Sequence, residues 1–468
     1  MLKKNQGVLV FLVLVVCVLI GVIIRQIVLR ISNASVAPKS VRSENLALGN
    51  GFVWSSALDK ALPASTAAAT YSVVTYDNAY PQYVNPSDGV LLIAASPASS
   101  AYCFLNWNVG DFSFAGDCRL IVTFIQSGTS GGMLFGLGGS ASFSSGVSTI
   151  NGGLAFYYDL QTSTTAFTLN GSASGNSTSF DAGINYTDFQ NSCIVDVRSF
   201  GGKRKVIVSH GQYRYVLNCM NLNDWVGSGS VVCIGASVAS AVSNTHRIQY
   251  VSLEKLSGGS GNFCWDAAAD GQPSSDAIAT VSTTSNDAGY PVFVDATKGM
   301  QITRATTSKT GAINWEMANF DFGSADFRLR ICLFENTNGQ GMMFSFGGSA
   351  AWSDFSTANG SICYRLQSTT KTSIWYKNGV QQGNFLAFHD SSGNQYSGKF
   401  VDLVFEARTA NGKRTGTVYY SRGGNKEHAI DLTGWTPAGK FFSVGARNGS
   451  AGSNAGVHYV RHVSLEYI

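Results

Sequence analysis

The sequence predicts an all-β fold: two tandem antiparallel β-sandwich domains of jelly-roll type, preceded by one transmembrane helix. Three observations predict it: short runs in which apolar and polar residues alternate, an internal duplication that fills most of the chain, and one long apolar run near its start. The composition is typical of a β protein, with 52 glycines, 28 phenylalanines and 19 tyrosines among 468 residues. A chain of this length can bury two separate cores.

The apolar run extends from Val8 to Ile24 without a charged residue. As a helix it would be about 26 Å long, and residues 27–29 bring it to the roughly 30 Å hydrocarbon core of a bilayer. It therefore predicts a membrane anchor over residues 1–30, with the lipid bilayer as a partner. The anchor side chains are Val8, Phe11, Leu14, Leu19, Ile24 and Arg25.

A cleavable signal peptide is the competing interpretation, because small residues follow at 35–37. The apolar core of a signal peptide is typically about 7–15 residues long, which is shorter than this run. Arg25 and Arg30 also separate the run from the small residues, so a retained anchor is favoured. Lys3 and Lys4 nearly balance the two arginines, and the positive-inside rule therefore leaves the orientation open.

The rest of the chain is organised by a duplication. Residues 31–53 are polar and irregular, as in a stalk, and residues 54–256 and 265–468 then repeat each other at an offset of roughly 210. Residues 257–264 begin with Ser-Gly-Gly-Ser-Gly and predict a flexible linker between two domains of one fold. The ordered matches include Tyr80-Pro81 with Tyr290-Pro291, Asn106-Trp107 with Asn314-Trp315, Gly138-Gly139 with Gly347-Gly348, and Gly202-Lys203-Arg204 with Gly412-Lys413-Arg414.

Short alternating runs predict the strands of each copy. In residues 327–333 (FRLRICL) every second residue is apolar and the others are Arg328, Arg330 and Cys332, which describes a half-buried strand. Similar runs lie at 119–125, 154–160, 194–197, 205–209, 231–235 and 247–253. They predict an antiparallel two-sheet sandwich or jelly roll, and the Asn-Gly pairs at 170–171 and 378–379 predict hairpin turns.

The order of these pieces resembles the concanavalin A-like sandwich superfamily, which includes laminin G domains, legume lectins and glucanases. The motifs are MLFGLGG, GLAFYYDL and FTLNG in the first copy and MMFSFGG, SICYRL and IWYKNG in the second. The resemblance implies that each run forms a strand, a loop, a strand and a hairpin on the concave sheet. It also implies glycan as a candidate partner.

The residues that such enzymes and lectins use for chemistry are not found at their usual spacing. Glucanases carry closely spaced carboxylates on one strand, in a Glu-x-Asp-x-x-Glu pattern that this chain lacks. Glu316 and Asp321 come nearest to it but have the wrong spacing, and Asn108 at the first-copy position cannot ionise. Calcium sites need clustered oxygen ligands, and Asp159 and Asp181 stand alone. We therefore predict no enzyme, no cofactor and no catalytic residue.

No metal site or nucleic-acid partner is predicted either. His458 and His462 would lie about 13 Å apart along a strand, which is too far to share a metal. Six of the seven charged residues among the first 49 are basic, so the remainder of the chain is close to neutral. A nearly neutral body gives no electrostatic case for nucleic acid, while the basic start suits anionic head groups.

Cysteines and sequons point to different compartments. Outside the anchor there are eight cysteines, and the duplication aligns Cys118 with Phe327, Cys193 with a position near Leu403, and Cys264 with Val53. Cysteine exchanging with core residues favours free thiols and a reducing compartment over a disulfide framework. Six sequons would matter only in the secretory lumen, and in a chain this rich in Asn, Gly, Ser and Thr several are expected by chance; they begin at Asn33, Asn170, Asn176, Asn185, Asn359 and Asn448.

Two sets of residues are candidates for partner or glycan contacts. Trp352 and Trp375 have no tryptophan counterpart in the first copy and are candidates for exposed contacts, whereas the tryptophans shared by both copies are predicted to be core. A basic hairpin recurs in each copy, either as a solvated strand edge or as a partner site. Its candidate contacts are Lys203, Arg204, Lys413 and Arg414.

These features together favour a non-catalytic, membrane-anchored structural protein. Its overall make-up is similar to that of membrane-anchored minor capsid proteins of large icosahedral double-stranded DNA viruses of the chlorella-virus type. That resemblance implies a place between a virion's internal membrane and its capsid, with other capsid proteins as partners. The alternative is a lectin-like carbohydrate-binding or attachment protein at a cell or virion surface, with glycan or surface proteins as partners.

Overall fold

The computed structural model describes the chain in segments. These are residues 51–75, 80–94, 101–127, 131–140, 153–159, 164–179, 190–210, 215–238, 245–256, 261–303, 308–335, 341–351, 361–367, 372–387, 399–420, 427–448 and 456–468. Residues 50–468 form one compact unit. The predicted anchor residues and most of the stalk lie outside the described residues, and within the described residues no helix is long and apolar enough to span a membrane.

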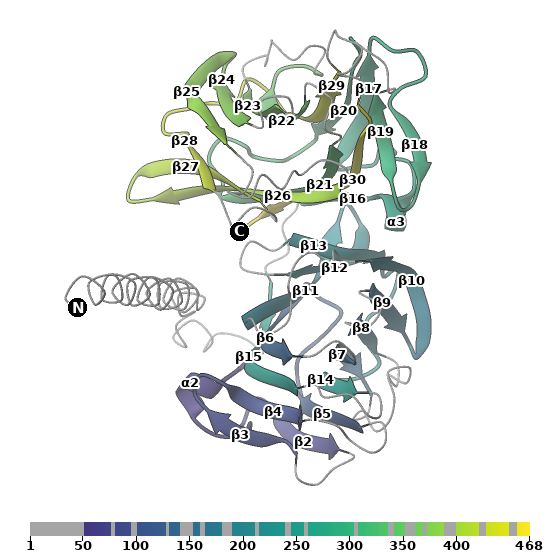
Figure 1. Ribbon diagram of the computed structural model, residues 1–468, viewed down its shortest axis with the longest axis vertical. Helices are drawn as coiled ribbons and strands as arrows, with labels where there is room; N and C mark the ends of the chain where they lie inside the picture. Colours follow the sequence, from purple (N-terminus) through teal and green to yellow (C-terminus); the bar gives the residue numbers. More distant parts are fainter. Residues whose placement is uncertain are drawn as a thin grey trace, which may run out of the picture. The chain divides into compact units, whose positions relative to one another are not determined.

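The described residues from 52 to 255 form two antiparallel sheets, A and B (Figure 1). Sheet A contains, in spatial order, β13 (Tyr215–Asn221), β12 (Lys203–His210), β11 (Gln190–Phe200), β6 (Cys118–Ser127), β15 (Thr245–Lys255), β4 (Gly89–Ala94) and β3 (Gln82–Asn85), and β1 (Phe52–Ser55) also pairs with β15. Sheet B contains β10 (Ser172–Ser179), β9 (Thr164–Leu169), β8 (Leu154–Asp159), β7 (Gly132–Gly139), β14 (Val231–Val238), β5 (Ala101–Asn108) and β2 (Thr70–Thr75).

The described residues from 263 to 467 form two further antiparallel sheets, C and D. Sheet C contains β18 (Val292–Asp295), β19 (Gly299–Thr303), β30 (His458–Tyr467), β21 (Phe327–Glu335), β26 (Lys399–Ala410), β27 (Lys413–Tyr420) and β28 (Glu427–Asp431), and β16 (Phe263–Asp266) pairs with β30. Sheet D contains β17 (Ala279–Ser285), β20 (Thr310–Met317), β29 (Phe441–Arg447), β22 (Gly341–Gly348), β23 (Ile362–Gln367), β24 (Thr372–Lys377) and β25 (Val380–Ala387).

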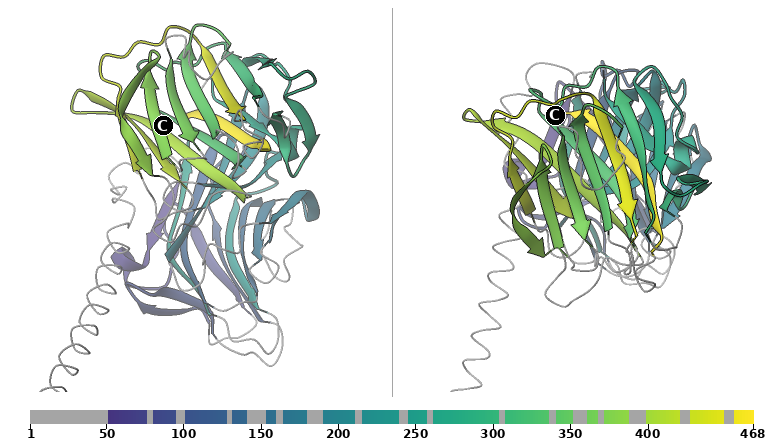
Figure 2. Two further views of the ribbon diagram at one scale, coloured as in Figure 1. Left: turned by 45° about the horizontal axis from the view of Figure 1, so that its top comes forward. Right: turned by 90° about the horizontal axis from the view of Figure 1, so that it is seen from above.

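Read from the opposite end, the strand order of sheet C matches that of sheet A strand by strand, with β28 in the place of β13 and β18 in the place of β3. Sheet D matches sheet B in the same way. Each pair packs face to face as a sandwich, as the three views agree (Figures 1 and 2). The prediction of an all-β fold with antiparallel sandwiches is therefore confirmed. The described helices are two short ones, α2 (Ser56–Asp59) after β1 and α3 (Ala267–Asp270) after β16.

Alternation along the strands builds one core inside each sandwich. In β7, for example, Met133, Phe135 and Leu137 belong to the core of the first sandwich, while the residues between them face outward. The tryptophans shared by both copies are confirmed as core residues, since each is at most 7% exposed. These are Trp54, Trp107, Trp225, Trp265, Trp315 and Trp435.

The predicted Asn-Gly turns are confirmed. Asn170 and Gly171 have positive φ angles of 52° and 80° between β9 and β10, and Asn378 and Gly379 have φ angles of 53° and 78° between β24 and β25. Two consecutive residues with positive φ match the right-handed twist of the flanking strands, and this is why Asn-Gly is favoured in two-residue hairpins.

Candidate functional site

The structure corrects the prediction that Trp375 is an exposed contact. Trp375 is 1% exposed and belongs to the core of the second sandwich, where its ring lies 4.4 Å from that of Tyr364. Its indole nitrogen donates a hydrogen bond to the carbonyl of His428. The aligned residue of the first copy is Phe167, also a core residue, and this match of two aromatic residues could have shown that the position is buried. Trp352 lies outside the described residues.

Each basic hairpin has one exposed lysine and one arginine that bonds within its own sandwich. Lys203 and Lys413 are exposed, and their role as partner contacts stays a prediction. Arg204 donates to the carbonyls of Phe114, Gly116 and Trp225. Arg414, 7% exposed, donates to the carbonyl of Ala325. Both arginines hold a loop of their own sandwich, which corrects the prediction that they contact a partner.

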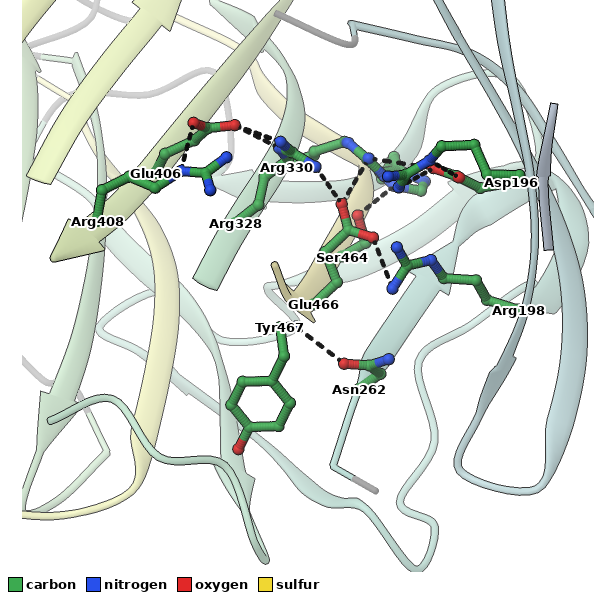
Figure 3. Close-up of polar contacts among 12 residues, drawn as sticks. Asp196, Arg198, Asn262, Arg328, Arg330, Glu406, Arg408, Ser464, Glu466 and Tyr467 are labelled. Carbon is green, nitrogen blue, oxygen red and sulfur yellow. Dashed lines mark hydrogen bonds and ion pairs between the residues drawn. The ribbon is translucent and has the colours of Figure 1, made fainter. Parts of the chain in front are cut away.

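The polar face of sheet C is buried against sheet A, whereas the sequence predicted a half-buried strand. Arg328 and Arg330 of β21 are only 3% and 1% exposed. Arg330 pairs with Glu466 of its own sandwich at 2.6 Å and with Asp196 of the first sandwich at 3.5 Å. Arg198 of the first sandwich pairs in turn with Glu466 at 3.3 Å (Figure 3). The two sandwiches therefore share a buried ionic cluster.

Further pairs extend this cluster within each sandwich. Arg119 binds Asp196 through two bonds, of 2.5 and 3.2 Å. Arg328 bridges Glu466 at 2.9 Å and Glu406 at 2.5 Å. Burial alone would raise the pKa of Asp196, but Arg119 and Arg198 outweigh burial and lower it to about 2. For the same reason the surrounding arginines hold the pKa of Glu466 well below its usual range despite burial.

Beside the ionic cluster lies a second buried group, built from a thiol of each sandwich. Cys219 of β13 and Cys264 of β16 are 2% and 8% exposed, and His462 of β30 is 1% exposed. Lys205 of β12 donates to the carbonyl of Cys264 at 2.8 Å and forms an ion pair with Asp270 of α3. These residues come from four strands and a helix that are far apart in sequence, so no motif could have predicted the group.

The two thiols of this group have different acidities. The hydrogen bond to Cys264, together with burial, raises the pKa of Cys219 well above its usual range. Burial would also raise the pKa of Cys264, but the hydrogen bond from Cys219 and the charges of Lys205 and His462 lower it. All eight cysteines in the described segments are buried free thiols.

The outward face of sheet D carries a row of mostly polar side chains, four of which are at most 6% exposed: Asn314, Ser345, Cys363 and Ser443. The strand register aligns Asn314, Ser443, Ser345, Cys363, Tyr376 and Gln381 across six neighbouring strands. Ser443 donates to the Oδ1 atom of Asn314 at 2.6 Å, and the Nδ2 atom of Asn314 donates to Thr284 at 3.3 Å. Tyr376 and Arg365 beside the row are half-buried and Gln381 is exposed, so this face presents aromatic, guanidinium and amide groups together.

The outward face of sheet B is more apolar. Phe104, Leu134, Ala155 and Cys233 form a cluster there, and the half-buried Tyr102 and Tyr157 pack against it. Asn106 occupies the position of Asn314 and is 1% exposed. The duplicated sheets thus keep an asparagine and tyrosines on the same face but differ in the polarity of what lies between them.

Glu316 and Asp321, the two carboxylates considered as a catalytic pair, have different surroundings. Glu316 is exposed on β20, whereas Asp321 binds the backbone nitrogens of Gly323 and Ser324 at 2.8 and 3.0 Å and so closes a turn. His458 bonds Thr303, and His462 bonds Asp266 at 2.9 Å. The prediction that the chain is no enzyme stays a prediction.

No protein-family model and no curated protein sequence matches the chain. Solved structures similar to part of it include arcelin-5, a lectin-like defense protein from Phaseolus vulgaris, at 9% identity and a TM-score of 0.34, covering 45% of this chain and 100% of that one. Lectin UEA-II complexed with galactose is 14% identical, with a TM-score of 0.31 and coverage of 44% and 97%. The Ca²⁺/Man3GlcNAc-bound exoplasmic/lumenal domain of VIP36 is 13% identical, with a TM-score of 0.30 and coverage of 41% and 84%. Likenesses of this strength transfer no binding property to this chain.

Proposed function

We propose that the chain is a non-catalytic, lectin-like carbohydrate-binding protein that binds glycan on the outward face of sheet D. The observation that supports the proposal most is the group of half-buried and exposed side chains Tyr376, Arg365 and Gln381, which lie on the same face as the buried pair Asn314 and Ser443. Hydroxyl, amide and guanidinium groups supply the donors and acceptors that sugar hydroxyls need, and an aromatic ring supplies an apolar face. A few such groups on a rigid sheet suffice to orient a small ligand.

The packing of the sandwiches supports this choice of face. Part of the outward face of sheet A is buried against the outward face of sheet C. Ion pairs of Asp196, Arg198, Arg330 and Glu466 join the two faces. Sheets B and D take no part in those ion pairs. Because sheet D carries the more polar row, we assign it the first binding site and sheet B, with Tyr102 and Tyr157, a weaker one.

A glycan array probed with the full-length protein in detergent tests the proposal. Tyr376→Ala should lower affinity for the bound glycan by at least about tenfold, which corresponds to ~1.4 kcal/mol. Val380→Ala on the adjoining β25 is the matched control, since Val380 is 64% exposed and lies one residue from Gln381. Absence of binding to every glycan, or binding that both Tyr376→Ala and Tyr102→Ala leave unchanged, would overturn the proposal.

A second candidate is the membrane-anchored structural role, such as that of a minor capsid protein joining an internal virion membrane to its shell. The apolar run from Val8 to Ile24 supports the anchor, and eight buried free thiols suit folding in a reducing compartment. Intact mass measured with and without reductant, and with and without glycosidase, separates the candidates. Native disulfides and occupied sequons would contradict assembly in the cytoplasm, whereas release of the protein into soluble fractions would contradict the anchor.

A further inference from the structure

We propose that Cys219, Cys264 and His462 bind a zinc ion that joins the two sandwiches. One ligand atom of each residue lies within 4.8 Å of the other two, and all three residues are buried. Tetrahedral zinc with Zn–S bonds of about 2.3 Å and Zn–N bonds of about 2.0 Å holds such atoms roughly 3.5–3.8 Å apart. A small inward movement of the side chains therefore completes the site.

The strand register brings the ligands to one face of sheet C. Cys264 lies opposite Ser464, and Asp266 lies opposite His462, in the pairing of β16 with β30. Residues two apart on a strand point to the same side, so Cys264 and His462 both face the first sandwich. Cys219 reaches the same place from β13, whose neighbour β12 supplies Lys205 to the carbonyl of Cys264.

Asp266 orients the histidine for metal binding. Its Oδ2 atom lies 2.9 Å from Nδ1 of His462, while its Oδ1 atom accepts hydrogen bonds from the backbone nitrogens of Ala268 and Ala269. A carboxylate fixed in this way keeps the proton on Nδ1 and leaves Nε2 for the metal, as is usual for zinc-binding histidines. Ser464, whose Oγ lies 3.2 Å from Nε2, would turn away or take the fourth position.

The charge around the group also fits a divalent ion. Two thiolates would neutralise Zn²⁺, and the adjacent Lys205 is already neutralised by its ion pair with Asp270. Soft sulfur ligands with one imidazole select zinc over calcium or magnesium. A metal bound by one ligand from the first sandwich and two from the second would stabilise their contact.

The test uses the full-length protein purified in detergent with a phosphine reductant and without chelator. We expect one zinc per chain by atomic spectrometry. After exchange with Co²⁺, thiolate-to-cobalt charge-transfer bands and tetrahedral ligand-field bands should appear. Cys219→Ser and His462→Gln should each lower the metal content at least tenfold, whereas Cys363→Ser, which removes a buried thiol in sheet D, should leave it unchanged.

Two outcomes would overturn the proposal. A wild-type protein that contains no zinc and gives no cobalt bands has no such site, and this result needs no variant to fold. Freshly lysed cells are denatured with a chelator and alkylated without reductant, and mass spectrometry then identifies a disulfide between Cys219 and Cys264 as two sulfurs that react only after reduction, a result that also excludes zinc binding. If a serine variant fails to fold, the intensity of the wild-type charge-transfer bands still reports how many thiolates bind the metal.

Discussion

Glu466 illustrates how single residues hold this molecule together. Its carboxylate pairs with Arg198 of one sandwich and with Arg328 and Arg330 of the other, and it is 1% exposed. Buried charges stabilise a fold only where they are paired, because removing one partner leaves the others desolvated. The stability of the contact between the sandwiches therefore depends on a few ionisable groups.

Glu466→Gln should be strongly destabilising. The substitution leaves three buried guanidinium groups without their shared carboxylate, and we expect a loss of about 3–5 kcal/mol in the free energy of unfolding. Urea denaturation followed by tryptophan fluorescence measures it. Glu316→Gln, which changes an exposed glutamate of β20, should stay within about 0.5 kcal/mol of wild type. Equal effects of the two substitutions would contradict the role of the cluster.

Acid should weaken the cluster in a defined pH window. The pKa of Asp196 is lowered to about 2 in the folded chain, against about 3.9 when unfolded. The stabilisation is thus complete above about pH 4 and is lost as the pH falls toward about 2. Burial lowers the pKa values of His246 and His458 to about 4, so they contribute a separate loss between about pH 6.5 and 4.

Denaturation midpoints measured across these pH values check this expectation. Asp196→Asn should be less stable than wild type at neutral pH and should show a flatter dependence below about pH 4. The histidine window above it should be unchanged in this variant. A wild-type midpoint that does not fall below pH 4 would show that Asp196 is not held in its charged form.

Trp375 is a core residue whose contribution to stability can be measured by substitution. Its ring packs between Tyr364, Phe344 and Phe405, so Trp375→Ala should cost about 3–5 kcal/mol through lost contacts and a cavity. Chemical denaturation measures the loss, with Val380→Ala as the exposed control. A substitution that lowered glycan affinity without loss of stability would instead restore Trp375 as a contact residue.

At the scale of elements, glycines at the ends of two strands allow close packing against core tryptophans. Gly138 at the end of β7 and Gly347 at the end of β22 have positive φ angles of 70° and 74°, and each lies against a core tryptophan. A Cβ atom on Gly347 would meet Trp435 at 2.6 Å, whereas a Cβ atom on Gly379 would meet nothing within 4 Å. Gly347 and Gly379 therefore have similar φ angles but differ in how closely other atoms pack against them.

Gly347→Ala should therefore be more destabilising than Gly379→Ala. Both place alanine at positive φ, which costs about 1–2 kcal/mol. Only Gly347→Ala also forces Trp435 aside, at a further cost of about 1–3 kcal/mol. Thermal unfolding of the two variants side by side measures the difference. The pairing of β22 with β29 shifts register between Phe346 and Gly348, and equal shifts in melting temperature would mean that this irregularity adapts without strain.

The elements also show how far the sequence alone can lead. Alternation in residues 327–333 predicted the strand β21 because period two follows directly from backbone geometry. The same pattern suggested a solvent-facing side for Arg328 and Arg330, since charged residues are rarely buried unless paired. Their partners Asp196 and Glu466 lie more than 100 residues away along the chain, and no local pattern reports such a pairing.

At the scale of the whole described unit, the fold could be predicted from the sequence, whereas the buried groups between the two sandwiches could not. Repeat matching identifies equivalent positions, such as Asn106 and Asn314 on the outward faces of sheets B and D. It says nothing of contacts that join one copy to the other: Arg198 and Glu466 form such a contact, although their aligned counterparts Arg408 and Glu254 are residues of the same type. Cys219, Cys264 and His462 have no aligned counterparts of the same type, so their group emerges only when two sheets are packed together.

The contact between the sandwiches should hold without the peptide that connects them. A protease site inserted after Ser257 permits cleavage between the two copies of the native protein. Because the cross-pairs of Arg198, Arg330 and Lys205 are buried, the two fragments should elute together in size-exclusion chromatography at physiological salt. Glu466→Arg places a further cation among the arginines and should release the fragments, whereas Glu316→Arg should not. Fragments of the unmutated protein that separate after cleavage would show that the linker, and not the buried cluster, keeps the two sandwiches together.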